Sequence, residues 1–153
     1  MNAAAPTLRL LIKPARGTDG PAIAALLRAA DLPHEDIGPH LANFLVARVG
    51  DEVVGAVGLE VHGADALLRS LVVAPELRGR SVGAGLTQTI MDRARGLGVR
   101  RLFLLTTTAE KFFLRRGFAV VARGIVPPAL AATQEFRCLC PATAVCLART
   151  LAP

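Results

Sequence analysis

The most informative part of this sequence is Leu71-Val72-Val73-Ala74-Pro75-Glu76-Leu77-Arg78-Gly79-Arg80-Ser81-Val82-Gly83-Ala84. It begins as an apolar run typical of a buried strand, breaks at Pro75, and continues through small residues into a helical pattern. Small residues let the backbone approach a ligand closely, and the free N–H groups at a helix start attract anions. Arg78 and Arg80 add positive charge at the same point. The stretch predicts a phosphate-binding loop; an ordinary tight turn with solvated arginines is the alternative.

The runs around this loop predict a mixed sheet. Strands are expected at seven places: 7–13, 43–49, 52–63, 66–74, 99–106, 118–123 and 142–149. The three runs between 43 and 74 are joined by short turns and predict an antiparallel meander. The strand–helix–strand unit at 66–105 requires a right-handed parallel crossover. We therefore expect a mixed α/β fold with a central sheet of about seven strands and helices on both faces.

Three helices are expected beside these strands. The first is capped by Thr18 or Asp19 and has a proline in its first turn. The second has an apolar stripe that runs from Val82 to Leu97. The third begins in a capping box formed by Thr107 and Glu110.

Length and composition limit the classes of protein that remain. The 153 residues are expected to form one domain, 1–153. No run of about 18 apolar residues lacks a charge, so no membrane span is predicted. Three cysteines are too few for a disulfide scaffold and favour a reducing cytoplasm, and no cluster has zinc-ligand spacing. The net charge of +6 indicates an anionic partner. Without Trp or Tyr, a single-stranded nucleic acid could stack only on six Phe, so a small phosphate-bearing ligand is preferred.

At two motifs the sequence resembles the GNAT acetyltransferase superfamily. The cofactor loop of that family reads Arg/Gln-x-x-Gly-x-Gly/Ala after a strand that ends in Val-x-Pro. Here the corresponding residues are Val73-Ala74-Pro75 and Arg78-Gly79-Arg80-Ser81-Val82-Gly83, with Ser81 in place of the middle glycine. A second family signature, Phe-Tyr-x-x-x-Gly-Phe, appears as Phe112-Phe113-Leu114-Arg115-Arg116-Gly117-Phe118. The resemblance covers roughly residues 7–149 and agrees with the expected order of strands and helices.

Further local matches are similar to the arsenic-resistance N-acetyltransferase subgroup. They lie at 58–60, 68–71, 105–109, 112–113 and 133–141. The subgroup is named after the genes that share its operon, and this name does not establish its substrate. The resemblance implies N-acetylation of a small-molecule amine, such as an amino-acid-like arsenical or phosphinate, in the cytoplasm. A protein N-acetyltransferase and a non-catalytic module that binds acyl-CoA or As(III) are the alternatives, and the sequence also allows a homodimer.

The resemblance implies that the cosubstrate is acetyl-CoA, bound where the fourth and fifth strands splay apart. Backbone groups of the fourth strand would pair with the pantetheine arm, and N–H groups of the loop would wrap the pyrophosphate. The implied cofactor-binding residues are Leu71, Val72, Val73, Arg78, Gly79, Arg80, Ser81, Val82, Gly83, Ala84, Thr107 and Phe112. Many family members use the Tyr of the Phe-Tyr pair to protonate the leaving thiolate. This chain has no Tyr, and Phe113 stands at that position.

Glu60 is the candidate catalytic residue. Alternation along its strand is expected to put one set of side chains on one face: Val54, Ala56, Gly58, Glu60 and His62. The small Ala56 and Gly58 would leave that face open as a cleft. Because the acceptor amine must lose a proton, Glu60 can act as the base or hold the ammonium group. A solvated carboxylate or a salt bridge to Arg69 is the alternative.

Arg69 and Ser70 are the candidate substrate-binding residues, beside the splay on opposite faces of the fourth strand. The guanidinium fork of Arg69 suits an oxyanion on the acceptor, or it pairs with Glu60. Three cysteines, Cys138, Cys140 and Cys146, offer thiols for As(III), or serve as small buried hydrophobic residues.

Overall fold

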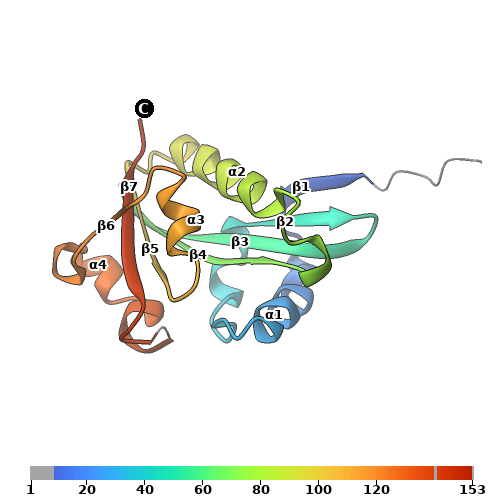
Figure 1. Ribbon diagram of the computed structural model, residues 1–153, viewed down its shortest axis with the longest axis horizontal. Helices are drawn as coiled ribbons and strands as arrows, with labels where there is room; N and C mark the ends of the chain where they lie inside the picture. The colour runs from blue at the N-terminus through green and yellow to red at the C-terminus, as the bar shows by residue number, and fades with distance from the viewer. Residues whose placement is uncertain (1–8, 140, 153) are drawn as a thin grey trace, which may run out of the picture.

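Seven strands form one mixed sheet in the computed structural model, which describes residues 9–139 and 141–152 apart from the side chains of 138 and 139 (Figure 1). The strands are β1 (Leu10–Pro14), β2 (Phe44–Val49), β3 (Glu52–His62), β4 (Asp65–Val73), β5 (Arg101–Thr106), β6 (Ala119–Val120) and β7 (Val145–Thr150). Their order in the sheet is β1-β2-β3-β4-β5-β7-β6. The sheet has about the expected number of strands, and its parallel β4–β5 pair lies beside an antiparallel meander. The expected fold class is therefore confirmed.

Helices cover both faces of this sheet. The α-helices are α1 (Gly20–Ala29), α2 (Val82–Gly96), α3 (Glu110–Leu114) and α4 (Pro128–Ala131). Short 3-10 segments lie at Gly17–Asp19, Gly38–Asn43, Pro75–Leu77 and Arg123–Ile125, and a π-helix lies at Glu135–Leu139. In Figure 1, α2 lies above the sheet and α1 lies below it. Phe113 of α3 packs in the same cluster as α2, and Leu130 of α4 packs against the opposite face at Leu67 and Phe103. None of the described helices is long and apolar enough to cross a membrane.

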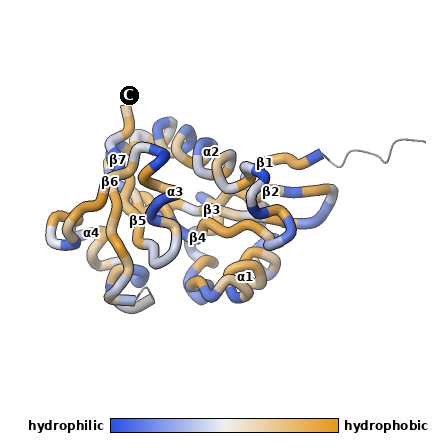
Figure 2. Tube along the Cα trace, in the orientation of Figure 1, coloured by the Kyte–Doolittle hydropathy of each residue, from blue (hydrophilic) through white to orange (hydrophobic). Residues whose placement is uncertain are grey.

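The core consists of apolar residues on both sides of the sheet, and Figure 2 shows hydrophobic residues along β4 and β5. Leu86 and Ile90 of α2 are fully buried in the larger cluster, whereas Ile23 and Leu27 of α1 belong to a second cluster on the other face. The apolar stripe of α2 ends earlier than expected, because Leu97 is 47% exposed beyond the helix end.

The fourth and fifth strands separate after a short parallel contact, as expected. Pairing joins Asp65–Leu67 of β4 to Arg101–Phe103 of β5 and goes no further along either strand. On its other edge, β4 stays paired with β3 as far as Val73. An opening therefore forms between the ends of β4 and β5, directly before the loop that leads into α2.

The expected alternation along β3 is wrong at its beginning. The β2–β3 register shifts opposite Ala47 and Arg48, which inserts Val54 as an extra residue. As a result Val54 packs in the α2-side cluster, and Val53 packs near Ala56 in the α1-side cluster. Such a bulge exchanges the faces of the residues beyond it.

The face expected to be open is in fact covered. Ala56 is fully buried in the α1-side cluster. At Gly58, a Cβ atom would overlap the ring of Phe44. The small residues of β3 therefore make room for a neighbouring side chain and for α1, and they do not leave a cleft.

Two further expectations are wrong, and one element was not expected. The N-cap of α3 is Ala109, and the hydroxyl of Thr106 accepts hydrogen bonds from the N–H groups of Thr108 and Ala109, so Thr107 is not the cap. The strand expected at 118–123 has only the two residues of β6. The π-helix was not expected from the sequence.

Candidate active site

The start of α2 has the geometry of an anion-binding site. Ser81 is its N-cap and makes no side-chain capping bond to the helix. The N–H groups of a first helical turn have no intrahelical acceptors, and the helix dipole adds positive potential there. Arg78 precedes this turn and is tethered to β4 by a bond from its Nε to the Val73 carbonyl, 3.2 Å long.

Ser81 has a left-handed backbone, with φ of +64°. This conformation costs an L-residue with a side chain about 1–2 kcal/mol, whereas glycine adopts it readily. Gly79 in the same loop also has a positive φ, +79°. The loop thus imposes the glycine-type conformation at the position where this chain departs from the family motif.

Phe112 of α3 packs against the first turn of α2. A Cβ added to Gly83 would lie 3.6 Å from two carbon atoms of the Phe112 ring. The guanidinium of Arg116 stacks on the Phe112 ring, 3.6 Å from the ring centroid. Arg116 Nη1 also donates a hydrogen bond to the Phe112 carbonyl at 2.8 Å. The structure therefore brings Phe112, Gly83 and the α2 loop together.

A cavity of about 610 Å³ occupies the opening between β4 and β5. Its inner wall consists of Ser70 and Leu71 from β4, Leu105 from β5, Thr107 from the following turn, and Phe113 from α3. Ser70 has φ of +60°, and two residues of β4 there face one residue of β3. This irregularity turns β4 away from β5 and helps to open the cavity.

The outer wall of the same cavity is charged. It includes Arg28 at the end of α1, with His34 and Glu35 in the loop that follows. The Arg28 side chain is exposed and makes no ion pair or hydrogen bond with the described residues. Glu135 of the π-helix also lines this cavity, but unlike the exposed Arg28 and Glu35 it is only 4% exposed.

Arg69 also lines this cavity, and its guanidinium is at the centre of a buried ion cluster. Its Nη1 donates to Asp36 Oδ2 at 2.7 Å and to Glu60 Oε1 at 2.6 Å, and its Nη2 donates to Asp36 Oδ1. A third carboxylate, that of Glu135, is 3.5 Å from Nη2. Burial lowers the pKa of Arg69, but the bonds and charges of these carboxylates outweigh burial, so its pKa is raised. The guanidinium is charged and already paired.

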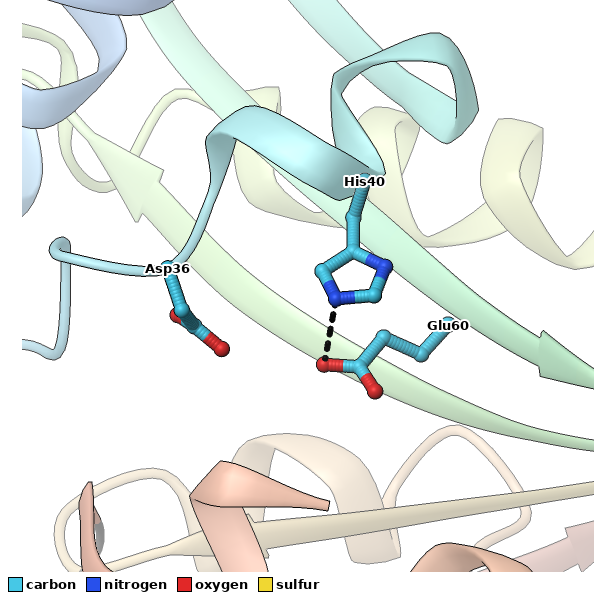
Figure 3. A group of neighbouring side chains, drawn as sticks. All are labelled: Asp36, His40 and Glu60. Atoms are coloured by element: carbon cyan, nitrogen blue, oxygen red, sulfur yellow. Dashed lines mark ion pairs between the residues drawn. The ribbon is translucent and has the colours of Figure 1, made fainter.

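Two histidines flank Glu60 on the side away from this cavity. His40 Nε2 is 3.4 Å from Glu60 Oε1, and His62 Nε2 is 3.6 Å from Glu60 Oε2. In Figure 3 the His40 ring stands over the Glu60 carboxylate, and the Asp36 carboxylate faces the same space. These residues line a second cavity of about 330 Å³.

Asp36, His40 and Glu60 each offer a metal-ligand atom within 4.8 Å of the others. The Arg69 guanidinium, however, is bonded to both carboxylates and already supplies a cation at this place. We therefore assign no metal to the cluster.

The candidate site residues fall into two groups in the structure. The loop 78–84 contacts the end of β4 through Arg78 and contacts Phe112 through Gly83. Leu71, Ser70 and Thr107 line the cavity, whereas its described lining includes neither Phe112 nor the loop 78–84. Glu60 is joined to Arg69, but it is 4% exposed and lines the second cavity. Cys146 is buried near Phe103 and Leu67 in a third apolar cluster, and burial raises the pKa of its thiol. The expectations on the Cys138 side chain and on Cys140 lie outside the described residues.

Sequence reasoning missed Arg28, Asp36 and Glu135. Arg28 looks in sequence like any solvated arginine on a helix. The other two are brought to Arg69 only by tertiary structure, from 33 residues before it for Asp36 and from the π-helix for Glu135. Their one sequence signal is acidity next to apolar neighbours, which many surface residues share.

Comparisons with known proteins agree with this geometry. Residues 40–120 match the model of the acetyltransferase (GNAT) domain. An amino-acid acetyltransferase of Neisseria meningitidis is 31% identical over 125 residues, which cover 76% of this chain and 29% of that protein. An amino-acid acetyltransferase of Ralstonia nicotianae is 36% identical over 80 residues, which cover 51% of this chain and 18% of that protein. The chain thus spans less than a third of the length of these curated relatives.

Solved structures show the same fold. N-acetylglutamate synthase from Neisseria gonorrhoeae, complexed with coenzyme A and N-acetyl-glutamate, has a TM-score of 0.84 and 25% identity over 95% of this chain and 36% of that chain. Rv2747 from Mycobacterium tuberculosis, in complex with CoA, has a TM-score of 0.80 and 23% identity over 93% of this chain and 99% of that chain. The two curated relatives are named as amino-acid acetyltransferases and do not bear on the arsenic-resistance resemblance. Because the family model covers more than half of the residues, the chain belongs to the GNAT acetyltransferase domain family.

Proposed function

We propose that this protein transfers the acetyl group of acetyl-CoA to the amine of a small amino-acid-like molecule. The observation that carries the proposal is the cavity between β4 and β5. It has an apolar and hydroxyl-bearing inner wall and a charged outer wall. Phe113 of the inner wall contacts Phe112, which packs against the anion-binding first turn of α2. The relatives named as amino-acid acetyltransferases, and one named with coenzyme A and N-acetyl-glutamate, support the same reaction class.

The proposed place of acetyl-CoA follows from the opening beside β4. From Leu71 to Val73 the edge of β4 that faces away from β3 is not paired with β5, and the Val73 carbonyl accepts a bond from Arg78 there. We propose that this edge pairs with the pantetheine arm and that the N–H groups of 79–84 bind the pyrophosphate. The acetyl end would then lie between Ser70 and Phe113. When bound, acetyl-CoA supplies the thioester carbon that the amine attacks.

The acceptor is proposed to enter from the charged side of the cavity. Arg28 is the cation of that wall without a partner among the described residues, and a guanidinium fork suits a carboxylate. Arg69 is the sequence-based candidate for this task, but its guanidinium is held by three carboxylates. We therefore propose that Arg28 binds an anionic group of the acceptor and that Arg69 shapes the floor of the cavity.

The reaction has two proton-transfer steps, one from the amine and one to the leaving sulfur. Phe113 lines the cavity, but its ring has no acidic group that could protonate the leaving sulfur. The sulfur therefore takes its proton from the reacting amine or from water. Glu60 is the sequence-based candidate for the base. Its bond to Arg69 keeps it near the opening, although it faces the second cavity.

The release of free thiol from acetyl-CoA tests the proposed function directly. We would offer L-glutamate, other L-amino acids, amino-acid-like arsenicals and phosphinates, and a peptide with a free N-terminus and a lysine. Thiol release with at least one small amine and none with the peptide is expected. Turnover with the peptide alone would make the protein a protein N-acetyltransferase. Coenzyme A binding without turnover of any amine would make it a non-catalytic module.

Narrower parts of the proposal rest on the sequence. Turnover of the arsenical in this panel tests the link to arsenic. Mass spectrometry of As(III) binding, compared between the parent and a Cys146→Ala variant, tests a role of Cys146 as a thiol ligand. We treat residues 1–153 as one domain that works in the cytoplasm. A homodimer is a further prediction, which light scattering of the purified chain tests.

A further inference from the structure

We propose that Glu135 is the catalytic carboxylate that holds the acceptor's ammonium group and receives its proton. This inference rests on the proposed function, because it places the acceptor amine in the cavity between β4 and β5. Glu135 begins the π-helix Glu135–Leu139, 75 positions after Glu60 in the sequence. Single π-helical turns are often found at functional sites.

Exposure distinguishes Glu135 from the other acidic residues of the cavity. Among the described residues, the carboxylates on the cavity wall belong to Asp31, Glu35 and Glu135. Asp31 and Glu35 are exposed, whereas Glu135 is 4% exposed. A charge pair shielded from water is stronger than one in bulk solvent. Glu135 is therefore the lining carboxylate best suited to hold an ammonium group.

Glu135 lies beside Arg69, close to Ser70 on the cavity wall. Its Oε1 is 3.5 Å from Arg69 Nη2, and Arg69 Nε donates to Ser70 Oγ at 3.1 Å. Ser70 is the left-handed residue at which β4 turns away from β5. Glu135 is thus next to the place proposed for the thioester, while Glu60 lines the second cavity.

The charge of the ion cluster favours an incoming cation. Three buried carboxylates surround one guanidinium, and Asp36 takes both of its Nη atoms. The Glu135 contact is the longest of the three. An ammonium group beside Glu135 would be attracted by this group of carboxylates, and the attraction is stronger where water is excluded.

The substrate class follows from two charged groups on the cavity wall. The buried Glu135 suits an ammonium group, and the exposed Arg28 suits a carboxylate, so the acceptor is an amino acid or a close analogue. One proton passes from the ammonium nitrogen to Glu135. The neutral nitrogen then bonds to the thioester carbon as the carbon–sulfur bond breaks, and a second nitrogen proton goes to the departing sulfur. Glu135 finally returns its proton to water.

Calorimetry without acetyl-CoA tests the ammonium contact. The probes are L-glutamate and glutarate, which differ in the amino group; if thiol release identifies another amine as the acceptor, that amine and its desamino analogue replace them. The parent protein should prefer the amine, and Glu135→Gln should reduce this preference by about tenfold to a hundredfold. Asp36→Asn is the control, because Asp36 binds the same guanidinium but does not line this cavity. It should lower the thermal stability and keep the preference.

Kinetics supply the second readout. Glu135→Gln should lower kcat by about 10²–10⁴, and Glu135→Asp, which keeps the charge, should keep the preference for the amine with a smaller loss of kcat. A folded Glu135→Gln protein with parental kcat or an undiminished preference would overturn the proposal for Glu135, as would a parent protein that does not distinguish the two probes. No turnover of any amine by the parent protein would instead overturn the proposed function.

Discussion

Arg69 Nη1 donates a hydrogen bond to Glu60 Oε1 over 2.6 Å, between two side chains that are almost completely buried. The same nitrogen atom also donates to Asp36 Oδ2. The bond joins β3 to β4 on the floor of the cavity, and Asp36 and Glu135 extend it to two segments outside the sheet. Arg69 therefore links the walls of the proposed acceptor site.

Replacement of Arg69 should destabilise the fold strongly. Arg69→Met leaves three buried carboxylates without their shared cation, and the loss of one partner of a buried pair costs about 3–5 kcal/mol. Urea denaturation measures the free energy of unfolding. Arg95→Met is the control, because Arg95 pairs with an exposed Asp92 and such a pair contributes about 0–1 kcal/mol. Equal losses in the two variants would contradict the assigned role of the cluster.

The stability that Asp36 contributes should depend on pH. Burial raises the pKa of Asp36, but the bonds from Arg69 outweigh burial, so the pKa is below its ordinary value of 3.8. A carboxyl group with a lowered pKa stabilises the fold above the ordinary value and loses this effect as the pH falls through the lowered value. The stability difference between the parent and Asp36→Asn should therefore be largest at neutral pH and shrink below pH 3.8. A difference that stays constant from pH 7 to about pH 2 would show that the pKa of Asp36 is not lowered.

Gly58 should not tolerate a side chain. A Cβ at this position would overlap the Phe44 ring, so Gly58→Ala should lower the free energy of unfolding by about 1–3 kcal/mol. Gly17→Ala is the control, because nothing lies within 4 Å of its added Cβ. Adding Phe44→Leu to Gly58→Ala should recover part of the loss. A double variant whose losses simply add would show that the ring is not the cause.

Ser81→Gly should stabilise the protein slightly. Relief of the left-handed backbone at φ of +64° gains about 1–2 kcal/mol, and the added freedom of glycine in the unfolded chain costs about 0.5–1 kcal/mol. Thermal unfolding should therefore show a net gain of about 0–1.5 kcal/mol. Ser81→Ala keeps the strain and is the control. A lower stability for Ser81→Gly than for Ser81→Ala would mean that the serine backbone is not strained.

The sequence predicted the parts of this molecule that depend on local patterns. The apolar run before Pro75 and the small residues up to Gly83 were sufficient to place β4, the loop and α2. The bulge at Val54 could not be predicted, because a single extra residue leaves the apolar pattern of β3 almost unchanged. Alternation alone therefore put Val54 on the wrong face.

The charged part of the site depends on contacts between distant segments. Glu60 and Arg69 are on neighbouring strands, and their pairing was one of the two alternatives considered from the sequence. Asp36 and Glu135 come from a loop and a π-helix that no periodic pattern identifies. The cluster is formed by tertiary packing, so only the structure shows that Asp36 and Glu135 contact Arg69 together with Glu60.

The affinity for coenzyme A of proteins altered at Gly83 tests the central claim most directly, namely that the start of α2 beside the β4–β5 opening holds acetyl-CoA. Gly83→Ala should bind with near-parental affinity, because its Cβ makes only ordinary contacts, the nearest at 3.6 Å. Gly83→Glu should lose measurable binding, because its carboxylate repels the pyrophosphate, and the uncharged Gly83→Gln of the same length should bind more tightly than Gly83→Glu. Calorimetry that finds parental affinity in a folded Gly83→Glu protein would contradict the account.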